Sequence, residues 1–389
     1  MELVQKSFID KNIVSTSEWY ITTENKKYID FTLGLSCFTW GYNNKRLINA
    51  LIRGIESGVN FTRGRENETC EILRKVNALI LSTTQMKSVL WTGSGTDAVE
   101  AAIQISRQYH SKVKDDRVEI LSLSNGYYGC SWLNKSLKGE RELSGINTVP
   151  LPDWNTLDER QMLEEHTFNK IIEKINSNNK IGTIIFESTP FSIGVRPWSN
   201  WWWEKIKELQ IQKDLIIILD DITGGFGKIA PFASHQRFNF SPDIITLGKG
   251  ITGGYAPVSC ALVGERIQPV IGKDSWTHGH TFQPFLAGLF LIEEIINMTN
   301  IENFTEKENK LTQFLDESIT KNYIKYYKGL GLARELVFNK KIDADYLERL
   351  GVITAKKRAD SILLVAPQNA TDEYWADVEK KLSTISRIH

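Results

Sequence analysis

The chain lacks several features that mark particular classes of protein. It has only four cysteines in 389 residues, widely spaced and without a CxxC pair, which fits a reducing compartment and gives no sign of a metal site. Its strongly apolar stretches, such as Leu215 to Leu219, are far shorter than the roughly 20 residues that span a bilayer. The start, Met1 to Asp10, carries charged residues in place of a basic end and an apolar run, so no signal peptide is visible. We therefore expect buried thiols, no bound metal and a cytoplasmic location.

An excess of either charge is also absent. The 47 lysines and arginines balance 47 aspartates and glutamates, so no positive surplus is available for nucleic-acid phosphates or an anionic membrane surface. Apolar residues make up 41% of the chain, which is ordinary for a globular protein with a substantial core. The length suggests two or three domains. We expect a small molecule as the partner, and neither nucleic acid nor a membrane.

The middle of the chain alternates short apolar runs with amphipathic stretches, as a parallel sheet with crossover helices does. A continuous run such as Leu215 to Leu219 predicts a strand buried on both faces, because an exposed strand would alternate. The clearest predicted helix is Asp97 to Tyr109, and a second, Glu159 to Ile175, lies in the polar segment 138–180, which we expect to be peripheral. The predicted strands are Ser88 to Trp91, Val118 to Leu123, Thr183 to Glu187, Leu215 to Asp220, Asp243 to Leu247 and Val258 to Val263.

The two ends of the chain differ from this middle part. Beyond about residue 290 the sequence turns to charged helix and short strands, and the first 45 residues have the character of strands and turns. We predict a large domain over residues 46–288 and a small domain formed from residues 1–45 and 289–389.

The segment Trp91-Thr-Gly-Ser-Gly-Thr-Asp97 joins a predicted strand to the amphipathic helix. Its glycines let backbone amides approach a ligand, and the start of the helix offers unpaired N–H groups. Ser94, Gly95 and Thr96 therefore form a candidate phosphate-binding loop. The alternative is a tight turn in which Ser94 or Thr96 caps the helix.

Two further candidates follow predicted buried strands. Asp220 ends the apolar strand and should project at the carboxyl edge of the sheet, where ligands of α/β proteins sit; the alternative is an aspartate that bonds its own turn. Lys249 lies between Gly248 and Gly250, directly after another strand. Partial burial would lower the pKa of Lys249 and make its amine a nucleophile able to form a Schiff base. The flanking glycines favour access to a planar ligand.

A phosphate loop, a strand-end carboxylate and a glycine-flanked lysine together meet the requirements of pyridoxal 5′-phosphate. As an ordered set, from about Trp19 to Pro367, the motifs resemble the class III aminotransferases of the aspartate aminotransferase fold type (fold type I), including the glutamate-1-semialdehyde aminomutase branch. The resemblance implies an α/β fold, with a mostly parallel seven-stranded sheet in the large domain and a small α+β domain. It also implies an aminotransferase that moves an amino group between a donor and an aldehyde or ketone acceptor through a Schiff base on Lys249.

The resemblance also implies roles for single residues. Asn125-Gly-Tyr-Tyr-Gly129 is similar to the family's aromatic-His-Gly motif, which implies that Tyr127 stacks on the cofactor ring. Tyr128 stands where the family has histidine and is a candidate for substrate contact. Phe186-Glu187 resembles the block that would put Glu187 beside the cofactor or on the substrate side.

The segment from Leu219 to Gly227 is similar to the family's Asp-Glu-Val block. It implies that Asp220 binds the pyridinium nitrogen, that Ile222 lies on the opposite face of the ring, and that Thr223 stands where the family often contacts the ring hydroxyl. His278-Gly-His-Thr-Phe282 looks like the segment whose threonine reaches the phosphate of the neighbouring subunit's cofactor. Thr281 would take that role, so a homodimer with shared active sites is expected.

The substrate side departs from the family pattern. Many relatives carry an arginine just before an apolar-Ala-Pro turn, where it binds a substrate carboxylate, and Ile362-Leu-Leu-Val-Ala-Pro367 has none. Either the substrate has no carboxylate at that place or another cation binds it. Arg63 and Arg65 are candidates at the substrate entrance, and the alternative for them is a solvated basic turn.

Two alternatives to aminotransferase activity stay open. The same cofactor supports aminomutases, decarboxylases and lyases, because one carbanion can partition in several ways. A non-catalytic binding protein that retained the fold is the other alternative, and Lys249 together with Asp220 argues against it.

Overall fold

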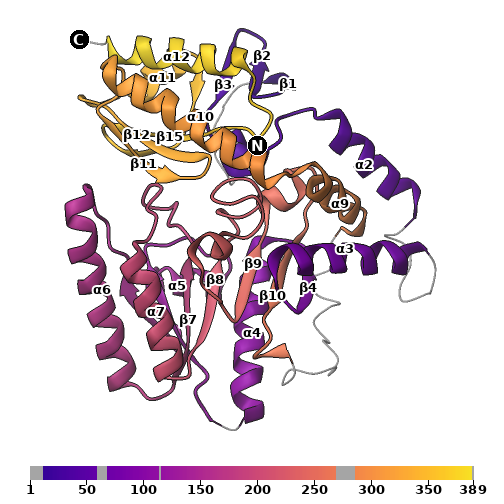
Figure 1. Cartoon of the computed structure of the whole chain (residues 1–389), viewed down its shortest axis with the longest axis vertical. Helices are drawn as coiled ribbons and strands as arrows, with labels where there is room; N and C mark the ends of the chain where they lie inside the picture. Colours follow the sequence, from indigo (N-terminus) through magenta and orange to yellow (C-terminus); the bar gives the residue numbers. More distant parts are fainter. Residues whose placement is uncertain (1–11, 59–67, 114, 269–284, 388–389) are drawn as a thin grey trace.

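A seven-stranded sheet forms the centre of the molecule (Figure 1). The computed structural model describes residues 12–58, 68–113, 115–268 and 285–387. In the order β4-β10-β9-β8-β7-β5-β6, β10 is antiparallel to both neighbours and the other pairs are parallel. The expected α/β class with a mostly parallel seven-stranded sheet is confirmed. The strands are β4 (Ser88–Thr92), β5 (Glu119–Ser124), β6 (Ile146–Pro150), β7 (Ile181–Glu187), β8 (Ile216–Asp220), β9 (Ile244–Leu247) and β10 (Ser259–Val263).

Helices cover both faces of this sheet, because alternate residues of a strand point to opposite sides. In β8, Ile216 and Ile218 pack in the cluster of α4, whereas Ile217 and Leu219 pack in the cluster of α7. The strand is buried throughout, as its continuous apolar run predicts. The first face carries α4 (Gly95–Val113) and α5 (Trp132–Leu137), and the second carries α2 (Lys45–Glu56), α3 (Glu68–Thr84), α6 (Leu157–Ser177), α7 (Asn200–Gln212) and α9 (Leu289–Met298).

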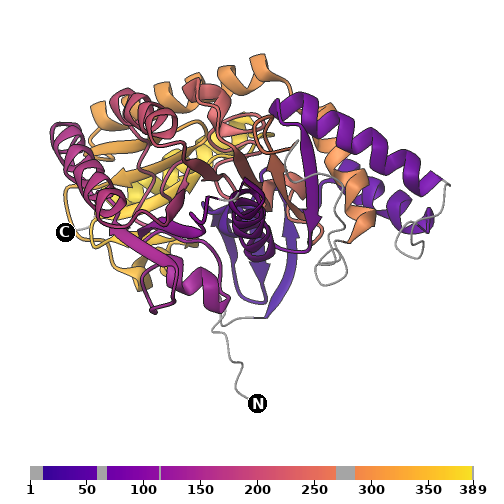
Figure 2. The ribbon, with the colours of Figure 1, turned by 90° about the horizontal axis from the view of Figure 1, so that it is seen from below.

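The second face is divided between two groups of helices (Figure 2). Helices α6 and α7 share a core with β5, β7 and β8, and α2, α3 and α9 share one with β9 and β10. Strand β6 lies in the segment 138–180, which was expected to be peripheral, and it pairs with β5 as the edge strand of the sheet. Its partly polar sequence gave too weak an alternation to predict a strand, and an edge strand needs less burial than a central one.

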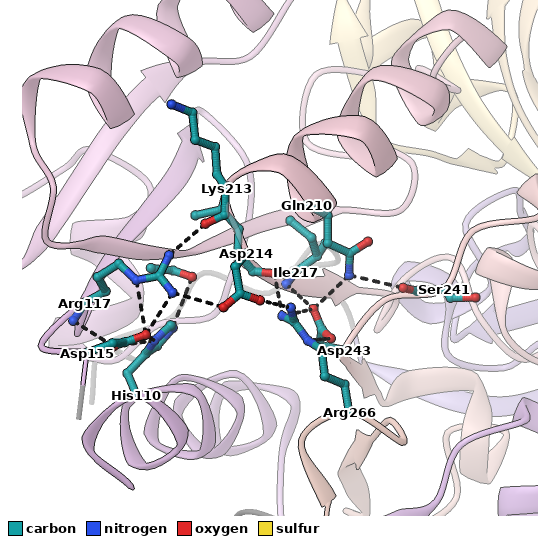
Figure 3. A network of polar contacts seen from close by, with 12 residues as sticks. His110, Asp115, Arg117, Gln210, Lys213, Asp214, Ile217, Ser241, Asp243 and Arg266 are labelled. Carbon is teal, nitrogen blue, oxygen red and sulfur yellow. Dashed lines mark hydrogen bonds and ion pairs between the residues drawn. The ribbon is translucent and has the colours of Figure 1, made fainter. Parts of the chain in front are cut away.

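Ion pairs tie together the amino ends of the central strands (Figure 3). Arg266 donates to Asp243 from Nε at 2.8 Å and pairs with Asp214 at 2.7 Å. Arg117 pairs with Asp115 at 2.8 Å and with Asp214 at 3.3 Å. These pairs lie at the edge of the sheet opposite to the carboxyl ends of β7 and β8, so they stabilise the sheet without entering its carboxyl edge.

Both ends of the chain contribute to a second part of the molecule, above the large sheet in Figure 1. Strands β1 (Ile13–Ser17), β2 (Tyr20–Thr23) and β3 (Lys27–Asp30) form a sheet with β13 (Val352–Ile353). One buried cluster unites residues from the start of the chain with residues from its end. The domain boundaries themselves stay a prediction. The remaining elements are α1 (Leu33–Ser36), α10 (Ile301–Thr320), β11 (Tyr326–Leu330), β12 (Ala333–Val337), α11 (Ala344–Arg349), β14 (Lys356–Arg358), β15 (Ser361–Val365) and α12 (Asp372–Ser386).

The described cysteine side chains are free thiols, and they differ in burial. Cys260 is buried in β10, Cys37 is half-buried and Cys130 is exposed. The expectation of buried thiols is therefore wrong for Cys130, because this residue lies in the open loop before α5. Among the helices of the described residues, none combines the length and the apolar character that a bilayer span requires.

Candidate active site

The parallel strands β7, β8 and β9 bring three sequence candidates to one edge of the sheet. Glu187 and Asp220 are direct neighbours at the ends of β7 and β8. Lys249 follows two residues after the end of β9, at the start of a short 3₁₀ turn, Lys249–Thr252. The topology therefore assembles these groups from three separate segments, each about 30 residues from the next along the chain.

Lys249 is held in a constrained turn. Its φ is +49°, a left-handed conformation that non-glycine residues rarely adopt and that carries backbone strain. Its Nζ donates to Thr223 Oγ1 at 2.7 Å. Burial lowers the pKa of Lys249, and the charges of Cys37, Glu187 and Asp220 oppose that shift. The amine is therefore easier to deprotonate than that of a solvated lysine, which suits a nucleophile.

Asp220 is a buried carboxyl group, and one of its two oxygens has no hydrogen-bond partner among the described residues. Its Oδ1 accepts from Ile222 N at 3.0 Å and from Thr246 Oγ1 at 3.2 Å. Its Oδ2 is buried and has no hydrogen-bond partner within the protein. Burial, reinforced by the nearby charge of Glu187, raises the pKa of Asp220 to about 7.

The unpartnered Oδ2 of Asp220 shows whether Asp220 and Lys249 suit pyridoxal phosphate as a ligand. A buried acceptor without a partner is costly, and a cationic N–H donor would both satisfy it and favour the ionised carboxylate. The ring nitrogen of pyridoxal phosphate is such a donor. Asp220 and Lys249 therefore fit the two ends of this cofactor's ring system.

Glu187 organises the loops around the site. Its Oε1 accepts from Tyr127 N at 3.0 Å and from Ser192 Oγ at 3.1 Å, and its Oε2 accepts from Phe191 N at 3.0 Å. Burial raises the pKa of Glu187. Because its acceptors are engaged by protein groups, this carboxylate holds the loops after β5 and β7 together.

The candidate phosphate loop lies at the start of α4. Ser94 Oγ donates to Asp97 Oδ2 at 2.8 Å and accepts from Asp97 N at 3.3 Å. The Ser94 hydroxyl therefore caps the start of α4, which is the alternative role that the sequence left open. Thr96 Oγ1 accepts from Cys130 N at 3.4 Å. The helix begins at Gly95, so the N–H groups of its first turn point out of the helix, as an anion site requires.

Ile222 links this loop to the lysine turn. A Cβ added to Gly95 would lie 3.0 Å from Ile222 Cδ1, and one added to Gly248 would lie 3.2 Å from Ile222 Cγ2. The side chain of Ile222 therefore lies against both glycines. The candidate phosphate loop, the turn after Asp220 and the lysine turn thus lie within the reach of one side chain.

The two tyrosines have different environments. Tyr127 is 52% exposed, which leaves its ring available to a ligand. Tyr128 is 1% exposed, and its hydroxyl donates to Leu123 O at 2.9 Å. The buried position of Tyr128 in the core beside α4 does not favour the contact with substrate that the sequence suggested. Arg63, Arg65 and Thr281 lie outside the described residues.

Sequence reasoning missed two groups of this site. Thr246, in the middle of the apolar strand β9, supports Asp220, and a hydroxyl inside an otherwise apolar run was the available signal. Lys228 is fully buried beside the lysine turn. Its signal was a lysine directly after the glycine-rich turn that follows Asp220.

Comparison with known proteins gives consistent sequence matches. The family profile of the class-III aminotransferases matches residues 9–386. The chain is 25% identical over 358 residues to gamma aminobutyrate transaminase 2 of Solanum lycopersicum, with 85% of this chain and 78% of the relative covered. It is 27% identical over 284 residues to an acetylornithine aminotransferase of Aquifex aeolicus, with 70% of each chain covered.

The fold is also similar to that of solved structures. One is an amine transaminase from an uncultivated Pseudomonas species in the PLP-bound form, with a TM-score of 0.82, 20% sequence identity, and 97% of this chain and 95% of that chain covered. At this level of identity, the likeness supports the fold type of the pyridoxal phosphate transaminases.

Proposed function

Because the chain belongs to the class-III aminotransferases, whose cofactor is pyridoxal phosphate, we propose that Lys249 and Asp220 are the residues that bind and use this cofactor here. The observation that carries the proposal is the buried, unpartnered Oδ2 of Asp220 at the same edge as the half-buried amine of Lys249. When bound, pyridoxal phosphate supplies an aldehyde that condenses with amines and a ring that withdraws electrons from the amine-bearing carbon.

The chain's own residues then have distinct tasks. Lys249 would hold the cofactor at its aldehyde carbon, and its amine would be placed to take the proton from the amine-bearing carbon of the substrate. Asp220 would accept a hydrogen bond from the ring nitrogen and so favour its protonated form. Thr223, which accepts from Lys249 Nζ, orients that amine, and Ile222 shapes one side of the ring site.

The remaining residues hold the cofactor in place. We propose that the start of α4, with Ser94, Gly95 and Thr96, binds the phosphate and that the exposed ring of Tyr127 packs on the cofactor. Glu187 would support the Tyr127 loop through its bond to the backbone.

We further propose a cytoplasmic homodimer, in which Thr281 of one subunit completes the phosphate site of the other. The sequence resemblance supports this arrangement, and sedimentation of the full chain tests it. A particle of twice the 44.4 kDa chain mass is expected. A monomer with undiminished activity would contradict it.

The substrates are a small amino donor and an aldehyde or ketone acceptor. The relatives act on different amines according to their names, so an absorbance screen of the half-reaction across amino acids, ω-amines and amino sugars identifies the donor. Transfer predicts loss of the bound cofactor's absorbance band with one equivalent of keto or aldehyde product. An isomerised or decarboxylated product with the band unchanged would instead favour a mutase, decarboxylase or lyase.

A further inference from the structure

A buried asparagine lies between the two loops that the proposed function assigns to the cofactor. Asn134, on the short helix α5, is 0% exposed. Its Nδ2 donates to Tyr128 O and, at 3.4 Å, to Thr96 O. One side-chain amide therefore bonds both the loop that carries Tyr127 and the first turn of α4.

The chemistry of an amide group suits this position. An amide nitrogen has two N–H donors, and the two carbonyl oxygens of Tyr128 and Thr96 engage both of them. The amide oxygen meets a donor instead, because Ser131 Oγ donates to Asn134 Oδ1 at 2.5 Å. An aspartate of the same shape would present an oxygen to both carbonyls, and an alanine would leave both without this donor.

The loop and the start of α4 are packed closely around this amide. A Cβ added to Gly129, whose φ is +124°, would lie 2.6 Å from Asn134 Nδ2 and 2.7 Å from Thr96 Oγ1. The backbone N–H of Cys130 donates to Thr96 Oγ1 at 3.4 Å. Thr96 is thus held through its carbonyl oxygen by Asn134 and through its hydroxyl group by the loop.

The same loop is also bonded to the carboxyl edge of the sheet. Glu187 Oε1 accepts from Tyr127 N at 3.0 Å, and Glu187 is the direct neighbour of Asp220 on the adjacent strand. A continuous series of bonds therefore runs from the end of β7 through residues 127 and 128 to Asn134 and on to Thr96. This series restrains the distance between the first turn of α4 and Asp220.

We propose that Asn134 is a positioning residue, which holds the phosphate-binding turn at Thr96 at the correct distance from the ring site at Asp220 and Tyr127. The inference rests on the proposed function of these residues. A cofactor that spans two sites binds tightly only where their separation matches its own length, because a displacement of about 0.5 Å already weakens the bonds to its phosphate. Contact between Asn134 and the cofactor is not required, since Asn134 acts through Thr96 and the loop.

The test compares two ligands that differ in the phosphate group. Pyridoxal 5′-phosphate spans both sites, whereas pyridoxal occupies only the ring site. Equilibrium titration of the full-length, cofactor-depleted chain, followed by absorbance, gives both affinities. In Asn134→Ala the affinity for pyridoxal 5′-phosphate should fall about tenfold, as for the loss of one hydrogen bond, and the affinity for pyridoxal should change less than about twofold.

A matched variant separates this effect from a structural one. Ser136 is buried on the same helix, and its Oγ donates within that helix to Trp132 O at 3.1 Å, so Ser136→Ala should leave the ratio of the two affinities unchanged. If Asn134→Ala does not fold, as judged by circular dichroism, Asn134→Ser replaces it, because the shorter side chain with its single donor cannot bond both carbonyls.

A folded variant of Asn134 that loses affinity for both ligands equally, or for neither, would overturn the inference. Failure of the wild-type chain to bind pyridoxal 5′-phosphate more tightly than pyridoxal would instead overturn the proposed phosphate site itself.

Discussion

Single residues of the site are buried without a hydrogen-bond partner, which lowers the stability of the cofactor-free protein. Asp220 is the clearest, because its Oδ2 is buried without a partner. In the folded, cofactor-free protein Asp220 keeps its proton up to about pH 7, whereas an unfolded aspartate loses it near the ordinary value of 3.8. The folded state therefore binds more protons between these values, and its stability falls as the pH rises through that range.

Asp220→Asn should remove this pH-dependent cost. We expect the cofactor-free variant to unfold at a higher temperature than wild type at pH 8 and at a similar temperature at pH 4, with a gain on the order of 3 kcal/mol at the higher pH. Differential scanning calorimetry at the two pH values measures it. Glu119→Gln is the control, because hydrogen bonds from Asn147 and Asn178 lower the pKa of Glu119, so its replacement should not stabilise the protein at pH 8. A loss of stability in Asp220→Asn at pH 8 would contradict the account.

Individual helices and strands place these residues. The N-terminus of α4 is held by Ser94, which bonds Asp97, and α7 is held in the same way by Ser199, which accepts from Trp202 N at 3.1 Å. Only the first of these helix ends lies beside Ile222 and the lysine turn. The two caps therefore separate the effect of helix stability from the effect of cofactor binding.

Ser94→Ala should weaken the binding of pyridoxal 5′-phosphate about tenfold, because it loosens the first turn of α4, the proposed phosphate site. It should also cost about 1 kcal/mol of stability. Ser199→Ala should cost a similar or larger stability without a change in cofactor affinity. Equilibrium titration of the cofactor-depleted variants measures the affinity. Equal affinity losses in both variants would assign the effect to general destabilisation.

Residues at the opposite edge of the sheet stabilise the fold without contacting the proposed cofactor site, and a substitution there can test this separation. Arg266 neutralises Asp243, which is 5% exposed, so Arg266→Met would leave a buried carboxylate without its cation. We expect a loss of about 3 kcal/mol in urea unfolding, partly restored by the added change Asp243→Asn. The folded fraction should keep its cofactor affinity, because Asp214 and Asp243 of the network in Figure 3 precede β8 and β9 and so lie at the edge of the sheet opposite to its carboxyl ends. A change in affinity that persists in fully folded protein would contradict this separation.

At the scale of the whole molecule, local sequence patterns predict the central strands but not the packing between distant segments. The central strands could be predicted because burial on both faces requires apolar residues at every position, as in β8. The position of Asp220 and Lys249 at the carboxyl edge could be predicted, because Asp220 ends β8 and Lys249 lies two residues after β9. The burial of Lys228 and Tyr128 could not, since it depends on packing between distant segments: Leu332 lies against Lys228, and α4 covers Tyr128.

The division into domains depends on the same long-range packing. Helix α9 follows the predicted boundary at residue 288, yet its buried residues share a core with β9, β10 and α2. We therefore propose that the large domain extends through α9, to residue 298. The composition of α9 does not show this boundary. An apolar helix could pack on either domain, and only the structure shows that α9 packs on the large sheet.

The attachment site of the cofactor tests the central claim most directly. Pyridoxal 5′-phosphate is added to the full chain, the product is fixed with borohydride, and the modified lysine is located by mass spectrometry of peptides. The account predicts one label per chain, on Lys249, and none at that level in a folded Lys249→Ala variant. A label on another lysine, or equal labelling of Lys249→Ala, would contradict it.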